Sequence, residues 1–170
     1  MVIETKRLIL REYRMDDLEE LYKILSCPIT MSHYIKPYDY EGTKRWIDWC
    51  IKSYEENGFG LWAMILKETN TLIGDCGVSL QKIDGEICPE IGYHIYKDYW
   101  RNGYGKEAAN AVKEWAFQNT SFETLYSYMT SSNIASYKTA ESIGMSRIKV
   151  YIENGEELLV YSIKKPKGEF

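Results

Sequence analysis

The feature that most restricts the fold of this chain is a change of pattern between Glu90 and Ala109, in the passage "EIGYHIYKDYWRNGYGKEAA". Its first half resembles a β-strand, and its last part carries alanines at helical spacing. Gly103 and Gly105 stand where the two patterns meet. The passage therefore predicts a strand, a glycine turn and a helix. Such a turn either only redirects the chain or brings backbone close to a ligand, because glycine has no Cβ.

A helix that starts after a glycine turn can bind an anion without a metal. About four N–H groups of its first turn have no partner within the helix, and the helix dipole adds roughly half a positive charge. The missing Cβ atoms of Gly103 and Gly105 would let phosphate oxygens approach. A phosphate-binding site is therefore the alternative to a simple turn.

The Walker phosphate loop does not fit this passage. It requires a glycine five residues before Gly105 and a serine or threonine directly after Lys106. The chain has Trp100 and Glu107 at these two positions. A Walker-type nucleotide site is therefore excluded.

The dinucleotide-binding fingerprint is formally met by Gly103, Gly105 and Ala108. In that fold an acidic residue that binds the ribose follows the next strand, about 20 residues further on. Glu123, the acid at that distance, stands at the start of the expected strand and not after it. The interpretation that remains beside a plain turn is the pyrophosphate loop of an acyl-CoA enzyme.

The rest of the chain alternates between strand and helix patterns without a repeat or a linker. Asp16 and Asp17 open a leucine-spaced helix that reaches Leu25, and Asn154-Gly155 is a strong hairpin signal between the last two strands. Glycines are expected to close two helices. We expect strands at 5–13, 60–66, 72–80, 88–97, 123–129, 146–153 and 157–165, and further helices at 41–58, from 103 onward, and at 133–144.

Composition limits the class of protein. A chain of 170 residues with 45% hydrophobic residues is expected to form one domain, residues 1–170. Its net charge of −4 gives no broad basic surface for nucleic acid. Four cysteines without a C-x-x-C pair, and two histidines, predict no metal site and reduced thiols. With neither a signal peptide nor an apolar run of about 18 residues, we expect no membrane contact and a cytoplasmic protein.

Four passages together resemble the GNAT superfamily of acetyl-CoA-dependent N-acetyltransferases, specifically its RimJ/RimL-like branch of ribosomal-protein acetyltransferases. They are "RLILREYRMDDLEELY", "GLWAMILKETNTLIGDCGVSL", "EIGYHIYKDYWRNGYGKEAANAVKEWAF" and "NIASYKTAESIGM". Superfamily loops usually begin with Gln or Arg, whereas Trp100, typical of this branch, begins the loop here. The resemblance implies an α/β (α+β) fold with a mixed, mostly antiparallel twisted sheet of about seven strands, splayed central strands and about four helices.

The resemblance implies acetyl-CoA as co-substrate and no metal. Main-chain N–H groups of the loop would hold the pyrophosphate, and backbone at Tyr93 and Ile95 would pair with the pantetheine arm as if it were a strand. Asn133 would touch the same arm, although it is equally an N-cap of its helix. The loop residues concerned are Trp100, Arg101, Asn102, Gly103, Tyr104, Gly105 and Lys106.

The reaction implied is direct attack of a neutral amine on the thioester, with one proton leaving the amine and one reaching the sulfur. Glu90 is the expected base. Many relatives carry a tyrosine acid seven residues after the asparagine, but this chain has Ala140 there. Ser136 takes its place, as implicated in the RimJ/RimL-like branch, and Tyr137 is the next candidate.

The acceptor pocket is expected between the first two helices, with His33, Tyr34 and Trp46 as substrate-binding residues. His33 could serve as a second base. The acceptor would be a protein N-terminus or a small amine such as a polyamine or an aminoglycoside, and a homodimer is possible. The alternative from another class is a non-catalytic module that binds acyl-CoA.

Overall fold

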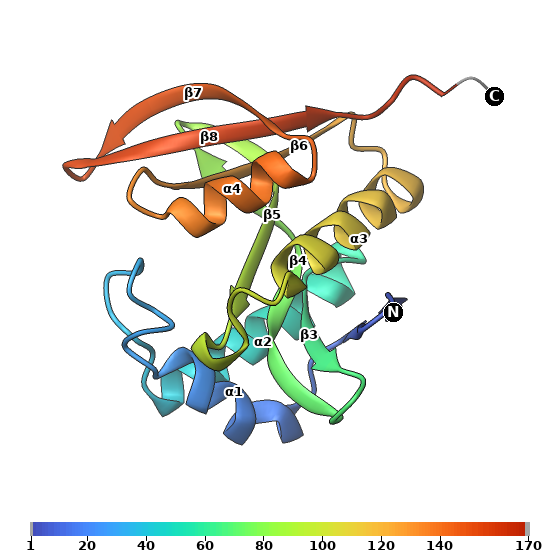
Figure 1. Cartoon of the computed structure of the whole chain (residues 1–170), viewed down its shortest axis with the longest axis vertical. Coiled ribbons are helices and arrows are strands. Elements are labelled where there is room, and N and C mark those ends of the chain that lie inside the picture. The colour runs from blue at the N-terminus through green and yellow to red at the C-terminus, as the bar shows by residue number, and fades with distance from the viewer. Residues whose placement is uncertain (1, 169–170) are drawn as a thin grey trace.

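A computed structural model of the chain describes residues 2–168, which form one mixed sheet covered by helices on both faces (Figure 1). The eight strands lie in the order β1-β2-β3-β4-β5-β6-β8-β7. They are β1 (Val2–Glu4), β2 (Leu8–Arg11), β3 (Leu61–Leu66), β4 (Thr71–Ile83), β5 (Glu86–Ile95), β6 (Thr124–Thr130), β7 (Ser146–Glu153) and β8 (Glu156–Lys164). The α-helices are α1 (Leu18–Leu25), α2 (Tyr40–Asn57), α3 (Tyr104–Asn119) and α4 (Ile134–Ser142).

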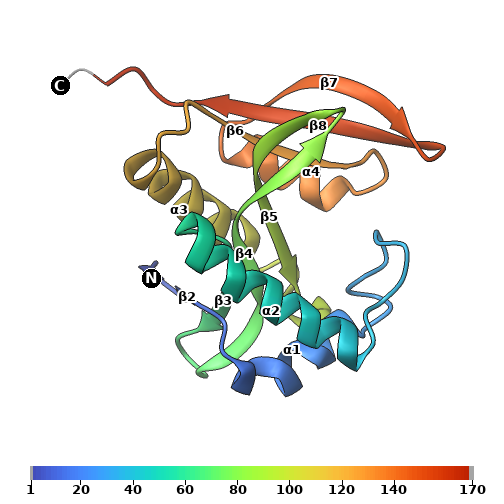
Figure 2. The same cartoon turned by 180° about the vertical axis from the view of Figure 1, so that it is seen from behind.

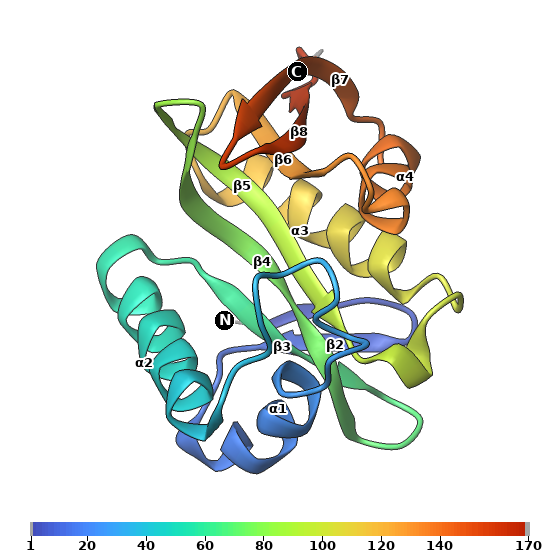
Figure 3. The ribbon, with the colours of Figure 1, turned by 90° about the vertical axis from the view of Figure 1, so that its left-hand side faces the viewer.

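All six residues of strand β3 are buried, because the strand lies between two apolar cores, one on each face of the sheet. Side chains alternate across a strand, so Trp62 and Met64 point into one core while Leu61 and Ala63 point into the other. Helices α3 and α4 cover the first core, and α1 and α2 cover the second. Figure 2 and Figure 3 show these two pairs of helices on opposite sides of the sheet.

The sheet opens between β5 and β6. Strand β5 pairs with β4 along all ten of its residues, whereas its parallel pairing with β6 has one register position, Glu90 opposite Tyr126. All other neighbouring strands are antiparallel. In Figure 1, β5 runs away from β6, β7 and β8 toward α1. The edge of β5 beyond Glu90 is thereby left without a neighbouring strand.

The expected elements are confirmed with one difference in number. The strand predicted at 5–13 is confirmed as the shorter β2, and an additional strand that was not predicted, β1, precedes it. A turn in which Thr5 bonds to the Leu8 carbonyl separates the two strands, so the sheet has eight strands in place of about seven. The predicted hairpin at Asn154-Gly155 is present, with both residues at positive φ. Gly58 ends α2 as expected, in the left-handed conformation.

Within residues 2–168, the helices are all too short or too polar to cross a membrane.

Candidate active site

The turn between β5 and α3 presents a row of unpaired backbone donors. Arg101 and Gly103 have positive φ, 61° and 79°, and α3 begins at Tyr104 without a side-chain cap. The amides before and after the row are used, since Trp100 donates to Lys97 and Glu107 donates to Gly103. The amides of residues 101–106 donate to no acceptor within residues 2–168. Successive free amides at a helix N-terminus form an anion-binding concavity.

The two glycines of the turn serve different purposes. Gly103 lies at φ 79°, where a side chain would strain the backbone. Gly105 has an ordinary helical backbone, and a Cβ on it would come within 3.2 Å of the Ile95 side chain. We expected both missing Cβ atoms to leave room for a ligand. At Gly105 the missing atom instead lets the first turn of α3 rest on β5.

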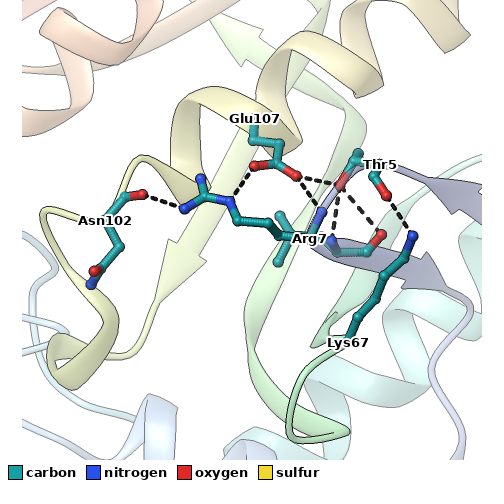
Figure 4. Close-up of polar contacts among 6 residues, drawn as sticks. Thr5, Arg7, Lys67, Asn102 and Glu107 are labelled. Carbon is teal, nitrogen blue, oxygen red and sulfur yellow. Dashed lines mark hydrogen bonds and ion pairs between the residues drawn. The ribbon is translucent and has the colours of Figure 1, made fainter.

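Arg7, the residue directly before β2, holds the turn through its side chain (Figure 4). Its Nε donates to Glu107 at 2.7 Å and its Nη1 donates to the Asn102 carbonyl at 2.8 Å. The guanidinium also lies 4.4 Å from the centre of the Tyr104 ring. Thr5 and the Arg7 backbone N–H donate to the second carboxylate oxygen of Glu107. The Arg7–Glu107 ion pair and its supporting hydrogen bonds therefore hold the turn at Asn102, near the start of the row of free amides, and at Glu107, directly after it.

The ionisation of Glu107 fits this role. Partial burial acts to raise the pKa of Glu107, but hydrogen bonds from Thr5 and Arg7 outweigh burial and hold the pKa below its ordinary value. The sequence indicates no function for Arg7. This residue opens the first passage that carries the family resemblance, yet nothing in that passage indicates a partner 100 residues away.

Trp100 and Asn102 stabilise the turn with their side chains rather than presenting them to a ligand. The Trp100 indole N–H donates to the Ile95 carbonyl at 2.7 Å. The Asn102 amide group donates to the carbonyls of Tyr99 and Trp100 at 3.1 and 2.9 Å. The Ile95 carbonyl, expected among the groups that pair with a ligand, is thus already engaged.

The free edge of β5 nevertheless offers backbone groups to the gap. The Tyr96 N–H donates to the Ile73 carbonyl on β4. In an antiparallel pair only every second residue bonds to the same neighbouring strand, so the backbone groups of Tyr93 and Ile95 point away from β4. On that side the Ile91 carbonyl accepts from Ser127 of β6 at 3.2 Å. Beyond this contact the N–H and C=O of Tyr93 and the N–H of Ile95 face the opening.

A cavity of about 380 Å³ continues from this opening toward α2. It brings together residues as far apart in the sequence as His33 and Leu158, and most of their side chains are polar or aromatic. The predicted site residues that line it are His33, Tyr34, Trp46, Glu90, Tyr93, Asn133 and Ser136.

Glu90 stands in this cavity at the point where β5 and β6 part. It is half-buried, and its Oε2 lies 3.5 Å from the Ser79 hydroxyl. Loss of hydration raises the pKa of Glu90 to about 7, against the smaller opposing effects of His94 and the Ser79 bond. A carboxylate that titrates near neutrality can accept a proton and release it again at physiological pH.

A buried pair beside Glu90 was missed by sequence analysis. Asp75 is fully buried, and its carboxylate accepts from the Nδ1 and N–H of His94 at 2.8 and 3.0 Å, from Trp46 at 3.1 Å and from Tyr13 at 3.1 Å. Burial acts to lower the pKa of His94, but the charge of Asp75, its hydrogen bond and the charge of Glu90 together outweigh burial and raise the pKa. An acid within the apolar run "LIGDCGVSL" was the available signal.

Helix α4 faces the same cavity with its first turn. The Asn133 side chain accepts from the Ser136 N–H at 3.2 Å, which is the N-cap bond considered for it. The Tyr93 hydroxyl donates to the Ser136 carbonyl at 3.4 Å and so spans the gap from β5. Tyr137 lies against Tyr161 with parallel rings and is not among the described residues that line the cavity. Ala140 is buried in the core.

The four cysteines are free, and residues 2–168 contain no group of three or more His, Cys, Asp or Glu side chains placed to hold a metal ion.

Comparison with known proteins identifies similar chains. The family described as "Acetyltransferase (GNAT) domain" matches residues 7–146. The protein YkkB of Bacillus subtilis (strain 168) is 31% identical over 161 residues, covering 94% of this chain and 94% of YkkB. The acetyltransferase structure from Agrobacterium tumefaciens str. C58 has a TM-score of 0.83 and 28% identity, covering 97% of this chain and 95% of that one.

A further solved structure is RimL, a ribosomal L7/L12 alpha-N-protein acetyltransferase in complex with coenzyme A. Its TM-score is 0.78 at 13% identity, and the match covers 96% of this chain and 98% of RimL. At this identity the likeness concerns the fold alone.

The Arg7 contacts lead to a prediction about ligand affinity. Arg7→Met keeps much of the side-chain volume but removes the donors to Glu107 and Asn102, so the free amides lose their fixed arrangement. We expect coenzyme A to bind about three- to tenfold more weakly, measured by calorimetry. Lys6→Met, an exposed neighbour, serves as the control. Equal affinities of the two variants would contradict a role for Arg7.

Proposed function

The chain belongs to the GNAT family of acetyltransferases, and from this premise we propose that it transfers the acetyl group of acetyl-CoA to a primary amine by direct attack in a ternary complex. We propose that one domain, residues 1–170, carries the whole activity in the cytoplasm. The observation that carries the proposal is the row of free amides at residues 101–106, next to an open strand edge and a cavity with a carboxylate.

The coenzyme diphosphate fits the free amides of residues 101–106. These donors need an anionic acceptor, and the dipole of α3 adds to the attraction. The exposed side chains of Arg101 and Lys106 supply positive charge. The pantetheine amides would pair with Tyr93 and with the N–H of Ile95, while Trp100 keeps the Ile95 carbonyl. RimL, a solved structure with a similar fold, is in complex with coenzyme A, which supports this proposal.

Acetyl-CoA, when bound, supplies a thioester whose carbonyl carbon is open to attack by an amine. Glu90 would take the proton that the amine must lose. At pH 7 the neutral form of an α-amine costs about 1.4 kcal/mol, and that of a lysine side chain about 4.6 kcal/mol. A base with a pKa of about 7 is well matched to the first of these acceptors.

Ser136 would donate the proton that the departing sulfur requires. It lines the cavity from the first turn of α4, whereas Tyr137 packs against Tyr161 and is the weaker candidate. The Tyr93 N–H, which faces the gap, would polarise the acetyl carbonyl. Asn133 would contact the pantetheine arm while it caps α4.

We propose a RimJ/RimL-like acceptor, a protein N-terminus, in preference to a polyamine or an aminoglycoside. Support comes from Trp100 and Ser136 in the sequence and from the acid–base match of Glu90. Tyr34 and Trp46 would hold the acceptor by their rings, and His33 lies at the exposed side of the cavity. The lining contains a carboxylate and no lysine or arginine, which favours a cationic group.

The acceptor class is tested by release of free thiol from acetyl-CoA. Purified protein is mixed with N-terminal peptides, polyamines or aminoglycosides, and binding of coenzyme A is measured in parallel. We expect turnover that is fastest with peptide α-amines. Tight coenzyme binding without turnover on any amine would favour the non-catalytic module instead. Absence of both binding and turnover would overturn the proposed function.

The role of Glu90 predicts a pH profile. The carboxylate form is the base, so kcat/KM rises as the pH passes through about 7, the pKa of Glu90. Glu90→Gln removes this limb and lowers the rate on a good amine about 100-fold or more. Glu86→Gln, an exposed acid on the same strand, should retain the wild-type profile. A Glu90→Gln profile identical to that of the wild-type protein around pH 7 would assign the base elsewhere.

The role of Ser136 predicts a selective loss of turnover. Ser136→Ala removes the proposed donor to the sulfur but keeps the backbone bonds of α4, so kcat should fall about tenfold or more with little change in KM for acetyl-CoA. Ser142→Ala, on the exposed side of the same helix, is the control. An unchanged kcat in Ser136→Ala would exclude this role.

A further inference from the structure

We propose that Asp75 and His94 form a positioning pair for Glu90, in which Asp75 holds a cationic imidazole and the charge of that imidazole keeps Glu90 ionised and turned into the cavity. This inference rests on the proposed function of Glu90 as the base. It adds two residues that neither touch the reacting atoms nor stand out in the sequence.

Strand register places the three side chains on one surface. Asp75 lies opposite His94, and Ser79 lies opposite Glu90, on the same face of the β4–β5 ribbon because the positions are even steps apart. The cross-strand pair between them is Gly77 opposite Gly92. Two polar pairs are thus separated only by a pair of glycines.

Gly92 provides the space that Glu90 uses. A Cβ added at Gly92 would meet the Glu90 Oε2 at 3.1 Å and its carboxyl carbon at 3.6 Å. The carboxylate therefore leans over the position of the missing side chain, along the strand in the direction of His94. Any larger residue at position 92 would push the carboxylate out of this place and screen it from the imidazole.

The bonds around Asp75 favour a charged His94. A fully buried carboxylate is stable only with strong donors. Asp75 has neutral donors from Trp46, Tyr13 and the His94 backbone, and a cationic His94 ring adds a charged donor to them. His94 is 8% exposed, and its Nδ1 donates to Asp75. The rings of Tyr34 and Trp46 pack against the imidazole at 5.0 and 5.4 Å between ring centres.

Glu90 is the group on which this charge acts. Loss of hydration raises the pKa of Glu90, and the His94 charge opposes that rise. In the reaction the attacking amine gives its proton to the Glu90 carboxylate, which later releases it to water. His94 keeps its own proton throughout.

Apart from His33, which lines the exposed side of the same cavity, the other titratable groups near the pair are hydroxyls and thiols that stay neutral at physiological pH, so His94 is the buried cation among them. They come from the segment before α1, from the segment between α1 and α2, and from α2 and strands β4, β5 and β6: Tyr13, Tyr34, Tyr38, Cys50, Tyr54, Cys76, Tyr93 and Tyr128.

The test is the pH dependence of kcat/KM in the full chain. His94→Gln removes the charge, and Asp75→Asn removes the group that stabilises it. Both variants should shift the acid limb upward by about 0.5 to 1 pH unit, with about a three- to tenfold loss at pH 6.5 that is recovered near pH 9. Tyr13→Phe removes one neutral donor to Asp75 and should leave the limb in place.

An even loss of rate at all pH values, without a shift of the limb, would overturn the inference, because a purely structural role gives that result. Should either variant fail to fold, NMR titration of the wild-type protein decides. The chain has two histidines, so His94 is readily assigned with His33→Gln. We expect the pKa of the His94 imidazole to lie above its ordinary value, and an imidazole that is already neutral at pH 6.5 would contradict the pair. This titration is informative even if no amine is acetylated, a result that would refute only the proposed function.

Discussion

The structure depends on the way in which β5 leaves the sheet. It pairs with β4 along its whole length but has a single register position with β6, at Glu90. A fully paired strand would have buried its backbone donors and acceptors in a ladder. Here the strand keeps one edge free beyond Glu90, and the Tyr93 hydroxyl bridges to α4 across the opening. The same separation produces the cavity and places the carboxylate at its inner end.

A second constraint fixes the turn that follows β5. Two residues at positive φ leave a row of amides unpaired, which would be unstable in a buried loop but is suited to an exposed anion site. The turn is held from outside, by Arg7 against Glu107 and Asn102, and from inside, by the Trp100 bond to Ile95. The site proposed for the diphosphate is thus held in place by the protein itself, and such pre-organisation reduces the entropy lost on binding.

The electrostatics of the cavity follow from a polar stripe in an otherwise apolar ribbon. Asp75, Ser79, Glu90 and His94 share one face of β4 and β5, opposite the face that enters the main core. Burying two acids there would be unfavourable with neutral partners alone. The imidazole satisfies one acid and moderates the other, so a single buried cation serves both the fold and the proposed chemistry.

The sequence by itself determined the local elements and the family: the strand, glycine turn and helix at 90–109, the Asn154-Gly155 hairpin, the helix stop at Gly58, and the residues that resemble GNAT enzymes. These follow from short-range patterns, since turn chemistry and periodicity act within a few residues. Only the tertiary structure decided that Glu107 binds Arg7, that Asp75 faces His94, that Trp100 turns back to Ile95, and that Tyr137 lies on Tyr161 while Ser136 lines the cavity. Such contacts depend on strand register and helix rotation, which are set by packing of the whole core and leave no signal in the spacing of the residues concerned.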